Sequence, residues 1–109
     1  MTENNVKEGQ EALGKAWARG CEFLGTEYAI MGGAMSWISD RNLVAAISNA
    51  GGFGVIACGA MTTDLLDAEI KGTQALTQKP FGVNLITMHP DLNELVDICL
   101  ENGVGHVVL

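Results

Sequence analysis

The chain has 109 residues, of which 48% are hydrophobic and 17% charged, so it is long enough for one hydrophobic core and too apolar for a disordered protein. Lys and Arg number 6 against 13 Asp and Glu, which gives a formal charge of -7, and no basic cluster occurs along the chain. This charge argues against nucleic acid and against an anionic membrane surface as partners.

Two sequence features bear on the cellular compartment. Charged residues are spread through residues 1–25, which breaks any signal-peptide hydrophobic region, and no uncharged apolar run approaches the ~18 residues of a membrane span. Cys21, Cys58 and Cys99 lie far apart without a CxxC pair, so the sequence predicts neither a disulfide framework nor a metal site. We expect a cytoplasmic protein whose cysteines are buried, reduced thiols.

The first predicted elements are a helix and a short strand. The larger apolar residues of segment 11–24 recur at helical spacing: Leu13, Trp17, Cys21 and Leu24. Because charged residues lie between them, the pattern is typical of an amphipathic helix. Gly25 ends the helix, and the apolar residues 28–31 predict a strand that runs into Gly32-Gly33.

The next predicted helix begins at a capping pair, Ser39 and Asp40. It ends at Gly51-Gly52, and residues 53–57 form a short apolar run directly after it. We interpret this run as the second strand.

The third helix and strand have the same organisation. Thr62 or Thr63 can begin a helix whose apolar residues Leu66 and Ile70 face inward. Lys79-Pro80 ends the connection, since proline disfavours helix at the residue before it. Residues 81–86 predict the third strand.

The last helix has the clearest periodicity of the chain. It begins at Pro90-Asp91 and ends at Asn102-Gly103. Its apolar positions match the helical template: Leu92, Leu95, Val96, Cys99 and Leu100. Residues 106–109 predict a fourth strand.

These elements form a regular β-α-β-α-β-α-β series whose strands begin about every 25 to 28 residues. Such a series fits a doubly wound sheet or a (β/α)8 barrel, and the four strands are close to half of a barrel of ~250 residues. We expect the fold class α/β, namely the N-terminal part of a (β/α)8 TIM barrel with about four parallel strands, intervening helices and an N-terminal helix. Residues 1–109 would then be the N-terminal half of a single, truncated domain.

The loop after the first strand is the first candidate site, because ligands of parallel α/β folds bind at the carboxyl ends of the strands. Gly32 and Gly33 allow a ring or an anion to approach the backbone closely, and Met35 offers a polarisable surface. A tight turn filled by a core methionine is the alternative interpretation.

Asn84 is the second candidate. Alternation along strand three places two sets of residues on opposite faces: Phe81, Val83 and Leu85 on one, Gly82, Asn84 and Ile86 on the other. If the bulky set meets the helices, Asn84 points into the barrel, where its amide needs a partner such as a cofactor. Neighbouring backbone could also satisfy it. His89 could titrate near a ligand or be a solvated turn residue, and His106, at the opposite end, is expected to be structural.

Well-known catalytic motifs are absent from the sequence. Gly51-Gly52-Phe53-Gly54 precedes a strand instead of opening a helix, so it does not qualify as a dinucleotide fingerprint. No phosphate-binding GxxxxGK[ST], no GxSxG and no HExxH occurs. The residues alone supply no complete catalytic set.

Three segments in this order resemble one family: Glu27–Trp37, Ala50–Ile56 and Lys79–Leu85. They are similar to the nitronate monooxygenases, formerly called 2-nitropropane dioxygenases, and the FMN-dependent enoyl-acyl-carrier-protein reductases share the pattern. The resemblance implies a TIM barrel with non-covalent FMN at the carboxyl ends of the strands.

The resemblance also implies residue roles. Carried over by position, the flavin contacts fall on Gly33, Ala34, Met35, Ser36 and Asn84. The family's catalytic histidine and its phosphate-binding loops lie in later strands, so the catalytic residues are expected beyond Leu109 and the 109-residue chain alone is expected to be inactive.

The activity implied is an FMN-dependent oxidoreductase that oxidises alkyl nitronates with molecular oxygen. An NAD(P)H-dependent FMN reductase or enoyl-thioester reductase is the alternative within the family. An alternative of another class is a non-catalytic half-barrel that dimerises. The expected partners are a small-molecule substrate with oxygen or NAD(P)H, no nucleic acid, no membrane, and a second copy if the protein is a homo-oligomer.

Overall fold

The computed structural model describes residues 2–109. Five helices and four strands follow one another in this order: α1 (Glu3–Ala16), α2 (Ala18–Leu24), β1 (Met31–Gly32), α3 (Arg41–Asn49), β2 (Phe53–Ala57), α4 (Thr63–Leu76), β3 (Phe81–Asn84), α5 (Leu92–Glu101) and β4 (Val107–Val108). From β1 onward, helix and strand alternate as the sequence predicts.

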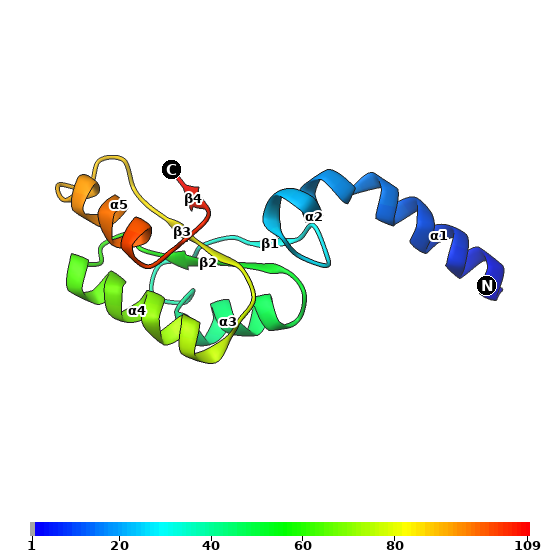
Figure 1. The fold of residues 1–109 in the computed structure, drawn as a ribbon, viewed down its shortest axis with the longest axis horizontal. Coiled ribbons are helices and arrows are strands. Elements are labelled where there is room, and N and C mark those ends of the chain that lie inside the picture. The colour runs from blue at the N-terminus through cyan, green and yellow to red at the C-terminus, as the bar shows by residue number, and fades with distance from the viewer. Residues whose placement is uncertain (1) are drawn as a thin grey trace.

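The strands form one parallel sheet in the order β1-β2-β3-β4. Helices α3, α4 and α5 lie side by side along one face of this sheet (Figure 1). A doubly wound sheet reverses its strand order and carries helices on both faces. Strict chain order with the helices on one face is the arrangement of successive βα units in a (β/α)8 barrel. The predicted fold class is therefore confirmed.

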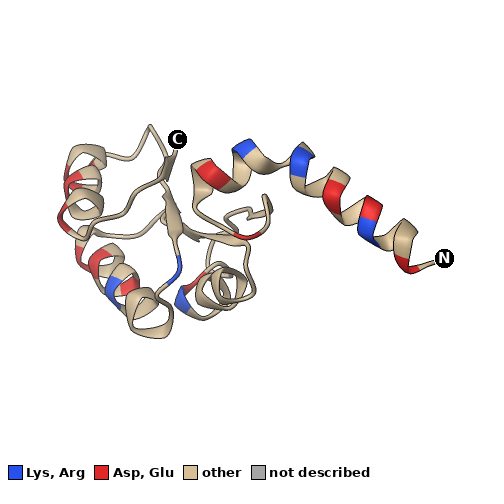
Figure 2. Cartoon of the chain, turned by 45° about the vertical axis from the view of Figure 1, so that its right-hand side comes forward, with Lys and Arg blue, Asp and Glu red and all other residues tan. Residues whose placement is uncertain are grey.

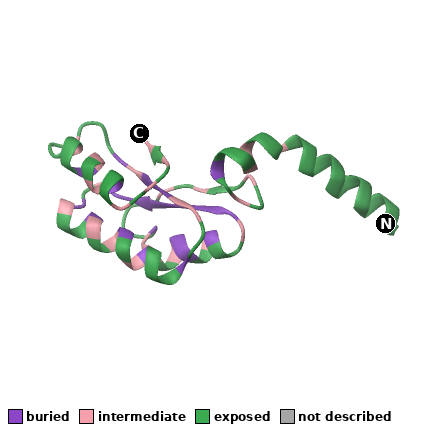
Figure 3. Cartoon of the chain, in the orientation of Figure 1, coloured by how far each residue is buried: buried purple, intermediate pink, exposed green. Residues whose placement is uncertain are grey.

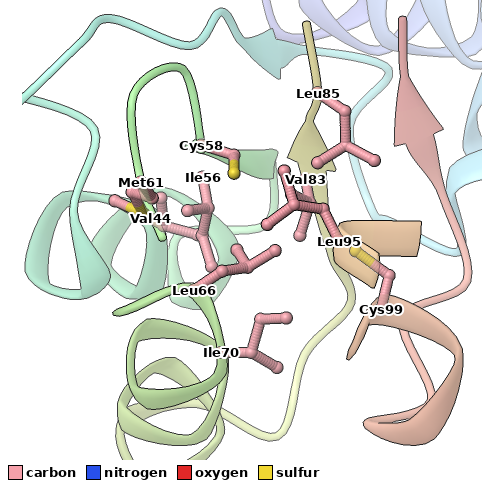
Figure 4. Close-up of a cluster of buried hydrophobic side chains, with 10 residues drawn as sticks. All are labelled: Val44, Ile56, Cys58, Met61, Leu66, Ile70, Val83, Leu85, Leu95 and Cys99. Atoms are coloured by element: carbon pink, nitrogen blue, oxygen red, sulfur yellow. The ribbon is translucent and has the colours of Figure 1, made fainter. Parts of the chain in front are cut away.

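The main hydrophobic core lies between the sheet and these three helices. Figure 4 shows its buried side chains: Val44, Ile56, Cys58, Met61, Leu66, Ile70, Val83, Leu85, Leu95 and Cys99. A second, smaller cluster of Leu24, Phe53 and Val55 occupies the other face of the sheet. Strand β2 is thus buried on both faces (Figure 3), which explains its continuous apolar sequence.

Helix starts follow the predicted capping residues. The Asp40 carboxylate accepts the amides of Leu43 at 3.2 Å and Asn42 at 3.0 Å, and these bonds hold the pKa of Asp40 below its ordinary value. The Thr62 hydroxyl accepts the Leu65 amide at 3.2 Å. Both caps therefore satisfy amides at the first turn that have no partner within the helix.

The N-terminal region differs from the single helix predicted over residues 11–24. Helix α1 begins much earlier, with the Thr2 hydroxyl accepting the Asn5 amide at 3.3 Å. The helical path breaks at Trp17, whose ring packs against Tyr28 with centroids 5.7 Å apart. Helix α1 buries no side chain and projects from the rest of the chain (Figures 1 and 3).

Element ends also differ from prediction. Strand β1 covers only Met31–Gly32, although the Ile30 carbonyl still accepts the Phe53 amide at 2.8 Å. Strand β3 ends at Asn84, two residues before the predicted end. Leu100, which matches the apolar template of α5, is 69% exposed. Apolar residues at helical spacing identify a helix, but they do not show which of its residues are buried. The face of α5 that packs against the protein is narrower than the full set of apolar positions.

The charged residues and the cysteines occupy different parts of the fold. Charged residues lie mainly on the helices, and the four strands carry none (Figure 2). Cys58 and Cys99 are buried as predicted, while Cys21 is only partly buried. No helix within residues 2–109 is long and apolar enough to cross a membrane.

Candidate functional site

The loops that follow β1, β2 and β3 meet at the carboxyl edge of the sheet. Ala57 pairs with Asn84 in the sheet, and the Cys58 amide donates to the Asn84 carbonyl at 3.1 Å. A Cβ built on Gly59 would lie 3.4 Å from the Ser36 hydroxyl and 3.9 Å from a methyl of Ile86. Residues from all three loops are therefore neighbours, in the region where parallel α/β folds bind ligands.

The two glycines after β1 have different roles. A Cβ on Gly32 would lie 2.5 Å from the Ile47 side chain, so Gly32 lets α3 pack against the sheet. A Cβ on Gly33 would meet nothing within 4 Å. Only Gly33 therefore leaves open backbone that a ligand could approach, whereas the sequence suggested this role for both.

The next residues form a tight turn with a partly exposed surface. Ala34 packs against the small core cluster on the inner face of the sheet. The Met35 carbonyl accepts the amides of Ile38 at 3.0 Å and Ser39 at 2.8 Å, which closes the turn. Met35 is 48% exposed, so it is not a core methionine, and Ser36 is exposed beside it.

Asn84 points away from the helices, as strand alternation predicts. Val83 and Leu85 on either side belong to the core on the helix side. The Asn84 side chain is partly buried and makes no hydrogen bond to any other group within residues 2–109. Neighbouring backbone within residues 2–109 does not bond this amide, which is open to solvent or to a ligand.

His89 is partly buried and bonded to two backbone groups, so it is not a freely solvated turn residue, and its proximity to a ligand stays a prediction. Its Nδ1 accepts the Asp91 amide at 3.0 Å, and its Nε2 lies 3.1 Å from the Met61 carbonyl. A neutral ring with the proton on Nε2 satisfies both bonds. His89 therefore links the loop after β3 to the loop after β2.

His106 lies at the amino end of β4 and contacts α2. Its Nε2 is 2.7 Å from the Phe23 carbonyl, and its ring meets Phe23 and Phe53 edge to face, with centroids 4.8 and 5.0 Å away. A hollow of about 580 Å³ adjoins it at this end of the sheet. The amino end of such a barrel serves stability, so the predicted structural role of His106 agrees with its position.

Two properties of the carboxyl edge, the thiol pKa of Cys58 and the backbone of Trp37, were not predicted from the sequence. Burial raises the pKa of the Cys58 thiol to about 11, with a smaller contribution from Cys99, so this thiol stays protonated near neutral pH. Trp37 has a positive φ of 63° and is 72% exposed. No periodicity or motif in the sequence predicts a left-handed backbone at a tryptophan.

The site residues suggested by the sequence thus lie together at one edge. Gly33, Ala34, Met35 and Ser36 follow β1, and Asn84 is the last residue of β3. Gly33 provides open backbone, Met35 a polarisable surface and Asn84 an unpaired amide. These three features fit a flat ligand with polar edges.

Comparison with known proteins gives a consistent result. The profile of the nitronate monooxygenase family matches residues 18–105. The structure of FabK from Thermotoga maritima superposes with a TM-score of 0.79 and 42% identity, covering 82% of this chain and 29% of that chain. A nitroalkane oxidase from Streptomyces ansochromogenes gives a TM-score of 0.71 and 25% identity, covering 81% of this chain and 35% of that chain.

Curated relatives show the same similarity. A Mycobacterium tuberculosis (3aS,4S,5R,7aS)-5-hydroxy-7a-methyl-1-oxo-octahydro-1H-indene-4-carboxyl-CoA dehydrogenase is 39% identical over 83 residues, which are 76% of this chain and 23% of the relative. A Paraburkholderia phytofirmans nitronate monooxygenase is 40% identical over 67 residues, 62% of this chain and 18% of the relative. The chain therefore spans a quarter or less of the length of these relatives. With the family profile covering most of its residues, the chain belongs to the nitronate monooxygenase family.

Proposed function

We propose that this chain forms part of an FMN-dependent oxidoreductase, a nitronate monooxygenase that oxidises alkyl nitronates with molecular oxygen. The observation that carries the proposal is the family match over residues 18–105, which includes every residue of the candidate site. The carboxyl edge supports the proposal, because Gly33 leaves open backbone there and Met35 offers an exposed, polarisable surface.

The residues present fit a flavin. The open backbone at Gly33 and the surface of Met35 would contact the ring, and the Asn84 amide would bond to its polar edge. When bound, FMN supplies the redox chemistry by accepting electrons from the substrate. The role of this chain is to position the ring and to exclude water from one side of it.

Proton transfer requires a group from elsewhere in the protein. Among residues 2–109, three titratable groups at the carboxyl edge are already engaged: His89 links two loops, the Cys58 thiol is buried, and Asp40 caps α3. Asp91, at the start of α5, is exposed to solvent and makes no capping bond. We therefore propose that the residue that handles the substrate proton, and the donors to the FMN phosphate, come from other strands of the barrel.

A second candidate is reduction of an enoyl thioester with NAD(P)H. It is favoured by the 42% identity to the Thermotoga maritima FabK and by the carboxyl-CoA dehydrogenase relative, which is 39% identical over 83 residues. Both candidates use the same flavin site and differ in the electron donor and acceptor.

One experiment separates the two candidates. The full-length protein is reconstituted with FMN and supplied either with an alkyl nitronate and oxygen, or with NAD(P)H and an enoyl thioester without oxygen. Oxygen consumption in the first mixture and no NAD(P)H oxidation in the second support the monooxygenase. The reverse result assigns the reductase, and activity in neither mixture contradicts both.

A further inference from the structure

The tip of the loop after β1 holds a tryptophan in a backbone conformation that tryptophan rarely adopts. Trp37 is the one non-glycine residue within residues 2–109 that has a positive φ, at 63°. It stands third in the turn closed by the 3.0 Å hydrogen bond from the Ile38 amide to the Met35 carbonyl. Glycine is the usual residue at a third turn position with positive φ, because a side chain is crowded there.

The base of this turn is fixed to the sheet. The Ser39 hydroxyl accepts the Met35 amide at 2.8 Å, and the Ser39 carbonyl accepts the Ala57 amide at 3.2 Å. Ser39 itself is buried. These bonds hold the turn against the end of β2, so the indole is kept at the carboxyl edge although 72% of it is exposed.

Other large apolar side chains surround the same edge. We call the following exposed residues of the loops after β1 and β3 the apolar rim: Met35, Trp37, Ile38, Ile86 and Met88. Loops 33–40, 58–62 and 85–91 contain no lysine or arginine. An anionic substrate group would find no lysine or arginine partner in these loops, whereas a hydrocarbon group would find several apolar surfaces.

We propose that Trp37 is a specificity-determining residue that contacts an apolar, uncharged part of the substrate, an alkyl chain or hydrocarbon ring extending beyond the flavin. This inference rests on the proposed function, which places FMN at the same edge. The strained turn presents the indole where a relaxed glycine turn would present none, and the flat indole face buries hydrocarbon at little cost in side-chain entropy.

Two substitutions at position 37 distinguish the effect of the indole side chain from the effect of the backbone conformation. Trp37→Gly removes the indole and adopts the positive φ without strain, so the turn is retained. Trp37→Phe keeps a flat aromatic face. Leu100→Ala is the matched control, because Leu100 is similarly exposed, at 69%, and lies on α5 outside the three loops.

The measurement is the binding of unreactive, unbranched alkyl amides of increasing chain length to the full-length protein with FMN bound, by calorimetry. For the unsubstituted protein and for Leu100→Ala, we expect Kd to fall by about fourfold with each methylene that the site covers. Trp37→Gly should lose most of this dependence and Trp37→Phe should keep most of it. FMN affinity, measured separately by fluorescence, should be the same in all four proteins.

Two results would overturn the inference. One is the same chain-length dependence in Trp37→Gly as in the unsubstituted protein. The other is loss of FMN from both Trp37 variants but not from Leu100→Ala, which would make Trp37 a support of the flavin loop. Failure of the proposed function gives a different result, a purified protein that takes up no FMN before any amide is added.

Discussion

Two asparagines of the chain differ in how their side chains are bonded within the protein. Asn49 is satisfied within the protein, since its amide nitrogen donates to the Leu76 carbonyl at 3.1 Å and its oxygen accepts the Thr77 hydroxyl at 2.6 Å. Asn84 has no such side-chain bonds within residues 2–109. Asn49 therefore joins α3 to the end of α4, whereas the Asn84 amide has no side-chain partner among the described residues.

Substitution of these two asparagines should have opposite effects. Asn84→Ala should weaken FMN binding by about tenfold, the effect of losing one hydrogen bond worth about 1 to 1.5 kcal/mol, with little change in thermal stability. Asn49→Ala should lower the melting temperature and leave FMN affinity unchanged. Fluorescence titration and a thermal melt of each full-length variant test this. Equal loss of FMN in both variants would contradict the assignment.

The cysteines should react with thiol reagents in a definite order. The raised pKa of Cys58, about 11, and the raised pKa of Cys99 both arise mainly from burial. In the native protein near pH 8, Cys21 should be alkylated first, and Cys58 and Cys99 only after unfolding. Mass spectrometry of time-resolved alkylation measures this order. Rapid native labelling of Cys58 would show that the edge of the sheet opens.

The raised pKa of the Cys58 thiol makes the stability of the protein depend on pH. Because the folded pKa of Cys58 lies above its value in the unfolded chain, the unfolded state loses this proton first as the pH rises. The free energy of unfolding should therefore fall between about pH 9 and pH 11 and be insensitive to this thiol below that range. Denaturant melts across this range, compared with Cys58→Ala, measure the contribution.

Sequence reasoning succeeded where the orientation of a side chain follows from periodicity. Strand alternation correctly directed Asn84 away from the helices, because the period along a strand is fixed. The strained conformation of Trp37 could not be predicted, since it depends on the turn closed by Met35 and fixed by Ser39. Whether the predicted flavin contacts touch FMN stays a prediction.

The packing of α3 against β2 depends on close backbone contact. A Cβ on Gly54 would lie 2.9 Å from the Val44 Cα and closer still to the Val44 carbonyl. Next to this contact, the buried Ser48 hydroxyl donates to the Pro80 carbonyl at 2.9 Å and accepts the Gly54 amide at 3.1 Å. Helix α3, β2 and the start of β3 are therefore locked together at one point.

Glycine substitutions test this contact against an exposed helix. Gly54→Ala should destabilise the full-length protein by about 2 kcal/mol or more, because α3 must move away from the sheet. Gly9→Ala, in α1 where nothing lies within 4 Å, should be neutral or stabilise α1 by about 0.5 to 1 kcal/mol. Chemical denaturation measures both. A neutral Gly54→Ala would contradict the packing described here.

Helix boundaries set by local residues were predicted, among them the starts of α3 and α4 and the end of α2 at Gly25, whereas the early start of α1 was not. Asp40 and Thr62 cap α3 and α4 because side-chain oxygens near a helix start satisfy free amides, a local effect visible in sequence. The break at Trp17 involves packing against Tyr28, eleven residues later. Tertiary contacts of this kind are not visible in a local pattern.

At the scale of the whole molecule, the sheet of residues 2–109 has two edges, β1 and β4. Exposed apolar residues lie on or beside these edges, among them Ile30, Met31 and Val107. Unpaired strand edges with apolar side chains favour association with further strands. The remaining strands of a barrel or a second copy would both cover them.

Expression of residues 1–109 alone tests which partner the edges need. We expect this chain to self-associate in sedimentation experiments and to retain no FMN, because donors to the phosphate are expected from other strands. A defined dimer that binds no flavin would support the alternative of a half-barrel scaffold. A monodisperse monomer that binds FMN would contradict the expectation that other strands are required.

The central claim, that this chain contributes the flavin site of an oxidoreductase, is tested most directly by the absorbance spectrum of the purified full-length protein. Acid release of the bound compound then identifies the cofactor. We predict the two-banded spectrum of a flavin in the near-ultraviolet and blue, and release of FMN. A colourless protein that also takes up no added FMN would contradict the claim and leave the fold as the established result.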